Sequence, residues 1–264
     1  YLHDYKAFCR ITILGGFLAI AALVMCLLFI LVDLGQPMRM FNVIFYATPT
    51  SVLFWDMVVL NGYLFLNTVI GWNVLEAERN GIHYQSWLKP LIYLSIPWAV
   101  GIHTVTAFLY CGLPGRGFWL TAILAPRFLA SAFAAGPAFL ILLCFIVRKV
   151  TDFDPGKKQI QALAKIVAYA ISINVFFFLC EVFVVFYSNI PEHKVHLQYL
   201  FAGLHGHGAL VPFMWTSMVL MGLGIILLVN PVTRKNESIL IVACIAVFAG
   251  TWIDKGLGMI SGGF

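Results

Sequence analysis

The sequence predicts an all-α fold, a polytopic bundle of transmembrane helices, on three observations. Of its 264 residues 62% are hydrophobic and only 10% are charged, whereas a soluble domain has about 25% charged residues. The mean hydropathy is +0.95. The apolar residues form long runs rather than the weak alternation typical of barrel strands. Because every backbone polar group must be bonded internally in lipid, such runs indicate helices.

Seven segments approach the roughly 20 apolar residues that a membrane-spanning helix needs. The chain starts at Tyr1 and stops at Phe264, so we expect one helical domain over residues 1–264, truncated at both ends. Seven spans are then a lower bound for the natural protein. The spans are expected at 10–32, 51–72, 90–111, 127–147, 162–187, 204–229 and 238–253.

The 16 Lys and Arg residues predict how the helices are oriented. Eleven of them fall on one side of the predicted membrane and five on the other, and the richer side is expected to be cytoplasmic. The net charge of +5 is therefore a topology signal and does not indicate nucleic-acid binding. The five on the outer side are Arg39, Arg116, Arg127, Lys194 and Lys255.

Ionisable side chains inside the spans are the most informative residues. Glu181 lies in the run FFFLCEVFVVF, Asp56 near the start of the second span, and His103 about two turns from the end of the third. A charge at mid-helix costs about 2.5–3.5 kcal/mol on insertion scales, so we expect these residues to be functional. A structural ion pair or interhelical hydrogen bond is the alternative. Arg127 and Lys255, at helix ends, could instead snorkel to the headgroups.

Polar residues also recur at helical spacing below two of these groups. Asp56, Tyr63 and Asn67 share one face of the second span, and Asn174 lies two turns below Glu181 on the fifth. Both stripes are predicted to relay protons. Hydrogen bonds that hold helices together would produce the same pattern.

His103 is followed by hydroxyl donors and precedes a loop with the aromatic residue Trp119. A quinone head group needs a donor for each carbonyl, an ionisable neighbour and flat apolar walls, so the third span suits a quinone site. Haem ligation by His103 with His205 or His207 is a minority alternative. These two histidines are expected to begin the sixth span; the other interpretation of their Gly-rich run AGLHGHGAL is that they lie at the interface, outside the hydrocarbon. The six cysteines have no C-x-x-C spacing, and no metal site is expected in this chain.

Several loop motifs resemble those of the NrfD/polysulfide-reductase (PsrC-like) membrane-subunit family. The run DLGQPMR at 33–39 resembles the family's D-L-G-x-P-x-R element. His103, then Pro114, Trp119 and Pro126, and then FLASAFAAGPA at 128–138 are similar to a second pattern of that family. The runs SVLFWD at 51–56 and WIDKGLGMISGGF at 252–264 look most like the DsrP-like subunit of the sulfite-reduction-associated DsrMKJOP complex.

The resemblance implies a membrane subunit with no redox cofactor of its own that exchanges electrons with menaquinone, although a haem b is sometimes raised for DsrP-like subunits. It implies eight to ten spans, and a ferredoxin-like iron–sulfur subunit on the extracytoplasmic face together with further subunits of an anaerobic respiratory complex in sulfur metabolism. The expected location is the cytoplasmic membrane of a bacterium or archaeon. On this basis the chain would act within a quinone oxidoreductase complex and not catalyse alone.

The resemblance and the residue patterns together give each candidate a role. His103, Asp56, Arg127 and Trp119 would bind the quinone; Glu181, Asp56, Tyr63, Asn67 and Asn174 would relay protons; and the loops with Asp33, Arg39 and Arg116 would dock the partner.

Two other functions remain open. An ion-coupled secondary transporter would also hold carboxylates inside helices, but it usually has inverted repeats with helices broken at mid-membrane. The prolines that could break helices, Pro97, Pro137 and Pro212, do not repeat in that manner. A haem b-containing quinol oxidoreductase subunit is the second alternative.

Overall fold

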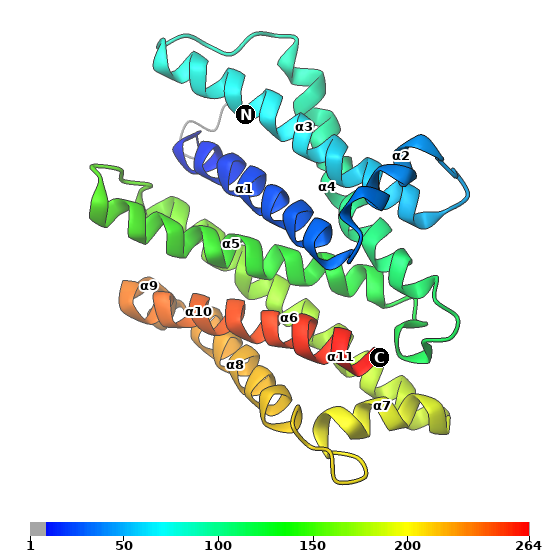
Figure 1. Cartoon of the computed structure of the whole chain (residues 1–264). Helices are drawn as coiled ribbons and strands as arrows, with labels where there is room; N and C mark the ends of the chain where they lie inside the picture. Colours follow the sequence, from blue (N-terminus) through cyan, green and yellow to red (C-terminus); the bar gives the residue numbers. More distant parts are fainter. Residues whose placement is uncertain (1–8, 264) are drawn as a thin grey trace. The chain divides into compact units, whose positions relative to one another are not determined.

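A computed structural model describes residues 9–263 of the chain. Within this range seven helices are long and apolar enough to cross a membrane, which confirms the predicted all-α bundle. The chain divides into two compact units, Tyr1–Leu109 and Tyr110–Phe264, and each is described by itself (Figure 1). The expectation of a single domain stays a prediction.

The first unit is built on three long helices. In its core, Ile70 and Val74 of the second long helix pack with Leu88 and Ile92 of the third. The chain reverses between that pair at Gly81, whose φ of +64° favours glycine. The elements are α1 (Cys9–Asp33), η2 (Pro37–Phe41), α2 (Asn42–Phe45), α3 (Val52–Arg79) and α4 (Leu88–Cys111), which ends just beyond the unit boundary.

A tryptophan fixes the contact between α3 and α4. The ring of Trp98 lies directly against Gly62, where a Cβ atom would collide with it. The indole N–H of Trp98 donates to the carbonyl oxygen of Val59 over 2.9 Å. Pro97 stands just before this residue, and α4 continues through it. The proline therefore does not break the helix, which removes one of the features that a transporter would need.

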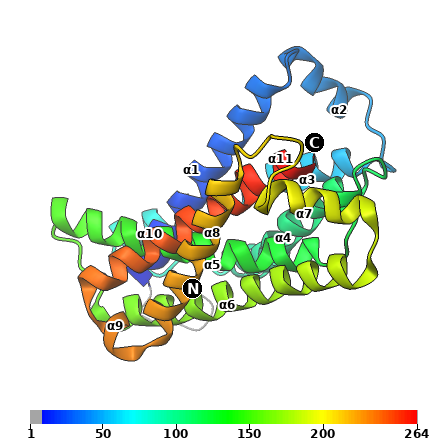
Figure 2. The ribbon, with the colours of Figure 1, turned by 90° about the horizontal axis from the view of Figure 1, so that it is seen from below.

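The second unit packs four long helices, α5 (Leu124–Val150), α6 (Lys157–Ser188), α8 (Val211–Val229) and α10 (Glu237–Ile253). They run side by side in Figures 1 and 2. The core between them includes Ile141, Ile171, Met221 and Val247, each at most 1% exposed. Shorter elements join the ends: η3 (Gly117–Trp119), α7 (Pro191–Phe201), α9 (Pro231–Lys235), the π-helical segment η4 (Asp254–Ile260) and α11 (Ser261–Gly263).

One end of this unit is polar and basic. Asn236 caps α10 by accepting hydrogen bonds from the backbone N–H groups of Ser238 and Ile239. The Arg148 guanidinium forms two hydrogen bonds with the carboxylate of Glu237, of 3.2 and 2.5 Å. This is the end that the charge distribution predicts to be cytoplasmic.

The opposite end of the second unit, where η3, α7 and α11 meet, is here called the cluster end. The Trp119 N–H donates to the carbonyl oxygen of Met259 over 2.8 Å. Nδ1 of His196 lies 2.8 Å from the carbonyl oxygen of Gly262. Gly263 packs so closely on the Trp119 ring that a side chain there would collide with it. These contacts tie the last described turn of the chain to the preceding loops.

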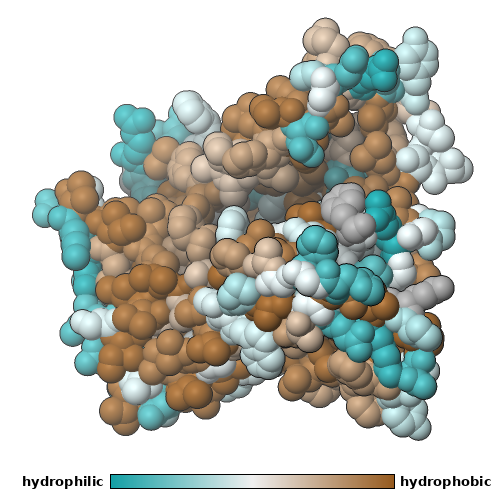
Figure 3. All heavy atoms as spheres, turned by 60° about the horizontal axis from the view of Figure 1, so that its bottom comes forward, coloured by the Kyte–Doolittle hydropathy of each residue, from teal (hydrophilic) through white to brown (hydrophobic). Residues whose placement is uncertain are grey.

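The surface is apolar enough for lipid. Large hydrophobic side chains are exposed on the long helices of both units, among them Phe29, Phe65 and Phe183, at 63–69%. Figure 3 shows apolar residues over much of the face drawn, with hydrophilic residues at its margins and in a band from its middle toward the lower right. So many exposed apolar side chains would be unfavourable in water, and they indicate a multi-pass membrane protein.

Several predicted ends of spans were wrong. The second span continues to Arg79 and the fifth begins at Lys157, because the helices extend past the apolar window into charged turns. The sixth begins only at Val211. His205 and His207 therefore do not begin it. They lie in an exposed turn closed by two hydrogen bonds between Leu204 and His207, with His205 and Gly206 both at positive φ.

The seventh span does not end at Ile253 as predicted. It continues as the π-helical segment η4 and then as α11 to Gly263. Helix α7 was also not predicted, since its sequence PEHKVHLQYLF is too polar for a span.

Small residues let α8 and α10 approach closely. A Cβ atom on Gly250 would come within 3.2 Å of the backbone nitrogen of Met221. The hydroxyl of Ser217 donates to the carbonyl oxygen of Gly250 over 2.7 Å. Small residues at a helix interface are the usual way in which membrane helices pack.

Replacing Gly250 by leucine should push α8 and α10 apart. Overpacking of this kind costs about 1–3 kcal/mol, so we expect a lower midpoint in thermal unfolding of the detergent-purified protein. Gly222→Leu is the matched control, since nothing lies within 4 Å of a Cβ atom at that glycine. Equal midpoints for the two variants would contradict the packing described.

Candidate functional site

A buried arginine joins three elements at the cluster end. Arg127, in the first turn of α5, is 4% exposed. Its Nη1 pairs with Oε2 of Glu181 on α6, and its Nη2 donates to Oδ1 of Asp254 on η4 over 2.7 Å. The guanidinium carbon lies 5.0 Å from the ring centroid of Phe178. The planar guanidinium therefore bridges two carboxylates, for which its fixed donor geometry is suited.

Lys255 adds a second basic side chain to this site. Its Nζ lies 4.5 Å from the ring centroid of Phe128. This Nζ is buried and has no hydrogen-bond partner. The same is true of Oδ2 of Asp254. The alternative that Arg127 and Lys255 snorkel to the headgroups does not hold, because both end groups are buried in protein. Arg127, Glu181, Asp254 and Lys255 are here called the Arg127 cluster.

The π-helical segment helps to bring Asp254 and Lys255 to the same side. Successive residues of a π-helix diverge less around the axis than those of an α-helix, and such segments are frequent at functional sites. The partners of these two residues are also consecutive in sequence: Arg127 donates a hydrogen bond to Asp254, and the ring of Phe128 contacts Lys255. Gly258 leaves room for Met214 of α8, whose side chain a Cβ atom would meet at 2.7 Å.

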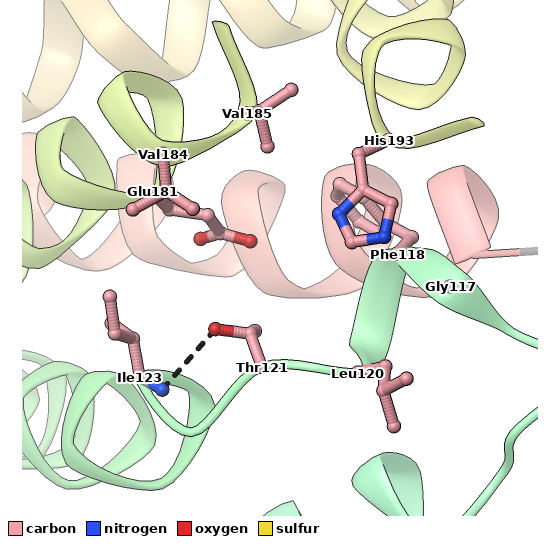
Figure 4. Close-up of a pocket in the computed structure, with 9 residues that line it drawn as sticks. All are labelled: Gly117, Phe118, Leu120, Thr121, Ile123, Glu181, Val184, Val185 and His193. Atoms are coloured by element: carbon pink, nitrogen blue, oxygen red, sulfur yellow. Dashed lines mark hydrogen bonds between the residues drawn. The ribbon is translucent and has the colours of Figure 1, made fainter. Parts of the chain in front are cut away.

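A cavity leads to Glu181. It has a volume of about 80 Å³ and lies among α6, α7 and the segment from Gly117 to Ile123. Figure 4 shows the Glu181 carboxylate directed into the space between α6 and the segment that carries Thr121, with His193 of α7 nearby. A second cavity, of about 10 Å³, borders Arg127, Glu181 and Asp254. That is room for about one water molecule.

Asn174 lies below Glu181 on α6, as the sequence predicts. It is fully buried, and its amide nitrogen lies 3.7 Å from the sulfur of Met221. Its Oδ1 has no hydrogen-bond partner. Farther along α6, Ile171 and Val167 are fully buried in the apolar core. The polar stripe therefore stops at Asn174 in the described structure of this unit.

The first unit contains the other predicted carboxylate. Asp56 is 8% exposed, and its Oδ1 accepts a hydrogen bond of 2.8 Å from the hydroxyl of Thr106 on α4. His103 lies on the same helix, about one turn before Thr106, and is partly buried. The amide of Asn67 donates to the carbonyl oxygen of Tyr63 over 2.9 Å. Asn67 is thus bonded to its own helix, as residues of this kind often are.

The remaining predicted residues lie near the ends of helices. Asp33 ends α1, Arg39 is exposed in η2, and Nη1 of Arg116 donates to the carbonyl oxygen of Gly263 over 3.3 Å. Trp119, predicted as a quinone wall, is 2% exposed and packs on Gly263. Asp33, Arg39, Asp56, Tyr63, Asn67 and His103 belong to the first unit, and Arg116, Trp119, Arg127, Asn174 and Glu181 to the second.

Sequence reasoning missed the role of Asp254. The apolar pattern places it at the outer end of the seventh span but does not pair it with Arg127. One signal was present, since Asp254 stands at the end of an apolar run in which the other charged residue is Lys255. An unpaired carboxylate beside an apolar span also needs a cation.

Removing the arginine should destabilise the fold strongly. Arg127→Leu leaves Glu181 and Asp254 as buried charges without their partner, which costs about 3–5 kcal/mol. Arg148→Leu is the control, since its ion pair with Glu237 is 34–41% exposed and such pairs contribute about 0–1 kcal/mol. Thermal unfolding of both variants would measure the difference. A loss for Arg127→Leu no greater than that for Arg148→Leu would contradict the ion-pair geometry.

Comparison with known proteins gives relatives that are described as subunits of reductases or of an oxidoreductase. A putative dimethyl sulfoxide reductase membrane subunit of Halobacterium salinarum is 23% identical over 98% of this chain and 62% of that protein. A selenate reductase subunit of Mesobacillus selenatarsenatis is 25% identical over 77% of this chain and 55% of its own length. An Hdr-like menaquinol oxidoreductase integral membrane subunit of Archaeoglobus fulgidus is 24% identical over 68% and 43%.

The chain spans about half the length of these curated relatives. A family model described as polysulphide reductase, NrfD, matches residues 1–262 of this chain. With its transmembrane helices and this match over nearly its whole length, the chain belongs to the NrfD family of polysulphide reductase membrane proteins.

Proposed function

We propose that this chain is the quinone-interacting membrane subunit of a redox complex. In this role it exchanges electrons between menaquinol or menaquinone and an iron–sulfur subunit on the extracytoplasmic face. The observation that carries the proposal is the Glu181 carboxylate, which borders a cavity while it pairs with the buried Arg127. Family membership and a relative whose name includes menaquinol oxidoreductase support it. The DsrP-like placement and a role in sulfur metabolism stay predictions.

The chemistry of quinol oxidation requires both a proton acceptor and a site for electrons to leave. The Glu181 carboxylate would accept a hydrogen bond from one quinol hydroxyl and then its proton. The positive charge of Arg127 would stabilise negative charge that develops on the ring oxygen. Two electrons would pass to the iron–sulfur clusters of the partner. For quinone reduction the same steps would run in reverse.

A quinone ring is larger than the cavity of about 80 Å³ beside Glu181, so binding would require side chains around it to move. His193 and Phe118 line this cavity and come from the short elements α7 and η3. We propose that these elements shift when the ring enters. Neither element contributes a residue to the core cluster between the long helices, and segments outside such a core open most easily.

The first unit has its own candidates for this reaction. Asp56 would exchange a proton and His103 would donate to a quinone carbonyl. The hydrogen bond from Thr106 holds the Asp56 carboxylate in place. Tyr63 and Asn67 would continue a proton path along α3, although the Asn67 amide is bonded to the carbonyl of Tyr63. A path along α3 therefore needs the Asn67 side chain to rotate.

Proton exchange in the second unit is proposed at the cluster end alone. A relay from Asn174 to the opposite end would need water to enter the apolar core around Ile171 and Val167. Dry cores of this kind do not hold water without polar partners. The loops with Asp33, Arg39 and Arg116 are the proposed docking sites for the partner subunit.

Glu181→Gln should slow quinol oxidation. Glutamine keeps the shape and can still accept a hydrogen bond, but it cannot take up a proton. Loss of a positioned acid–base group typically costs about 10²–10⁴-fold in rate. The measurement is reduction of the partner's iron–sulfur clusters by menadiol in the complex purified from membranes. A rate equal to that of the unmodified complex would rule out Glu181 as the proton acceptor.

Asp56→Asn tests the first unit in the same assay. Asparagine can still accept the hydrogen bond from Thr106, so the local structure should persist while proton exchange is lost. We expect the rate of menadiol oxidation to fall by at least about tenfold if Asp56 takes part in proton transfer. Thr106→Val is the control, which removes the hydrogen bond and keeps the carboxylate. An unchanged rate in Asp56→Asn would assign Asp56 a structural role.

A further inference from the structure

Lys255 has a feature that the other members of the Arg127 cluster lack. Arg127 donates to both Glu181 and Asp254, so each carboxylate has a cationic partner. The Lys255 Nζ has no hydrogen-bond partner, although it is buried. A buried ammonium without a partner costs much more than a neutral amine at the same place. Of these four groups, Lys255 is therefore the one whose charge is not fixed by an ion pair.

From this geometry we infer that Lys255 is the residue on which a proton exchanged with the quinol comes to rest. The inference rests on the proposed function and names a residue that acts behind Glu181. Glu181 borders the cavity and would take the proton first, but a protonated Glu181 would lose its ion pair with Arg127. The same holds for Asp254. A proton that enters the cluster therefore moves on to Lys255.

The small cavity provides a path for the step from Glu181 to Asp254. It has a volume of about 10 Å³ and borders both Glu181 and Asp254, which is room for about one water molecule. Oδ2 of Asp254 is buried and has no partner, so it can accept a hydrogen bond from that water. Asp254 and Lys255 are neighbours in the π-helical segment. The order of transfer is quinol hydroxyl, Glu181, water, Asp254 and Lys255.

The charges of the cluster agree with this assignment. With Lys255 as an amine, Arg127 faces two carboxylates and the net charge is −1. Uptake of one proton makes the ammonium and brings the net charge to zero, which offsets part of the cost of burying an ammonium that has no hydrogen-bond partner. The charged groups around Lys255 are Arg127 of α5, Glu181 of α6 and Asp254 of η4. Helix α8, which also packs against η4, has no ionisable side chain.

The reaction balances in atoms and electrons. The quinol gives up two electrons to the iron–sulfur clusters of the partner and two protons, as both of its O–H bonds break. One proton forms a new N–H bond on the Lys255 amine, and the other leaves to water at the cluster end. Lys255 later releases its proton to the same water, which resets the cluster for the next quinol.

Infrared difference spectra of the purified complex, recorded on addition of menadiol, test where the proton rests. In the unmodified complex we expect no carbonyl band from protonated Glu181 or Asp254. Such a band would be recognised by its disappearance in Glu181→Gln or Asp254→Asn. In Lys255→Met such a band should appear, because the proton must then stay on a carboxylate. A band in the unmodified complex that either carboxylate variant removes would overturn the inference.

Turnover of menadiol gives a second readout. Lys255→Met and Lys255→Arg should both slow oxidation by about 100-fold, since methionine cannot take up a proton and an arginine side chain stays protonated in proteins. Lys165→Met, at an exposed position of α6, is the matched control and should keep the normal rate. A Lys255→Arg variant with the normal rate would also overturn the inference. Failure of the unmodified complex to oxidise menadiol would contradict the proposed function instead.

Discussion

The bridge from Arg127 to two carboxylates is the interaction on which the second unit depends. Burying three charged side chains among apolar helices is unfavourable unless they pair with good geometry. Here one guanidinium satisfies Glu181 of α6 and Asp254 of η4 at the same time. The requirement fixes the relative depth of α5, α6 and the end of the last helix. A membrane bundle gains little from the hydrophobic effect between helices, so a polar contact of this kind also helps to specify the packing.

The end of the last helix is shaped to meet this requirement. A regular α-helix would turn Lys255 farther from the face that holds Asp254, and the π-helical segment reduces that divergence. Glycines then allow the segment to pack closely. Gly258 accommodates Met214, and Gly262 accommodates Leu200 of α7. Trp119 and Arg116 of the preceding loop bond to the carbonyl oxygens of Met259 and Gly263. The loop, α7 and the last turn thus support the cluster together.

The sequence predicted the fold class and the positions of most helices, because long apolar runs have one solution in lipid. It also identified Glu181 and Arg127 as unusual, since charge in an apolar segment is costly wherever it lies. It did not pair Arg127 with Asp254, because a partner 127 residues away leaves no local pattern. The turn at His205 was missed for a different reason. It has positive φ angles at Gly203, His205 and Gly206, and glycines in an apolar run look like ordinary helix glycines.

The position of the cavity bears on how electrons could move. In the proposed function, electrons from a bound quinol leave directly to a partner subunit. That requires the ring to lie near the surface on which the partner docks. The cavity beside Glu181 is bordered by η3 and α7, the connecting elements at the cluster end, and not by the middle of the long helices. Arg116, a predicted docking residue, lies immediately before η3. A ring that reaches Glu181 there would stand close to the docking loop, while Arg127 behind it keeps the carboxylate in place.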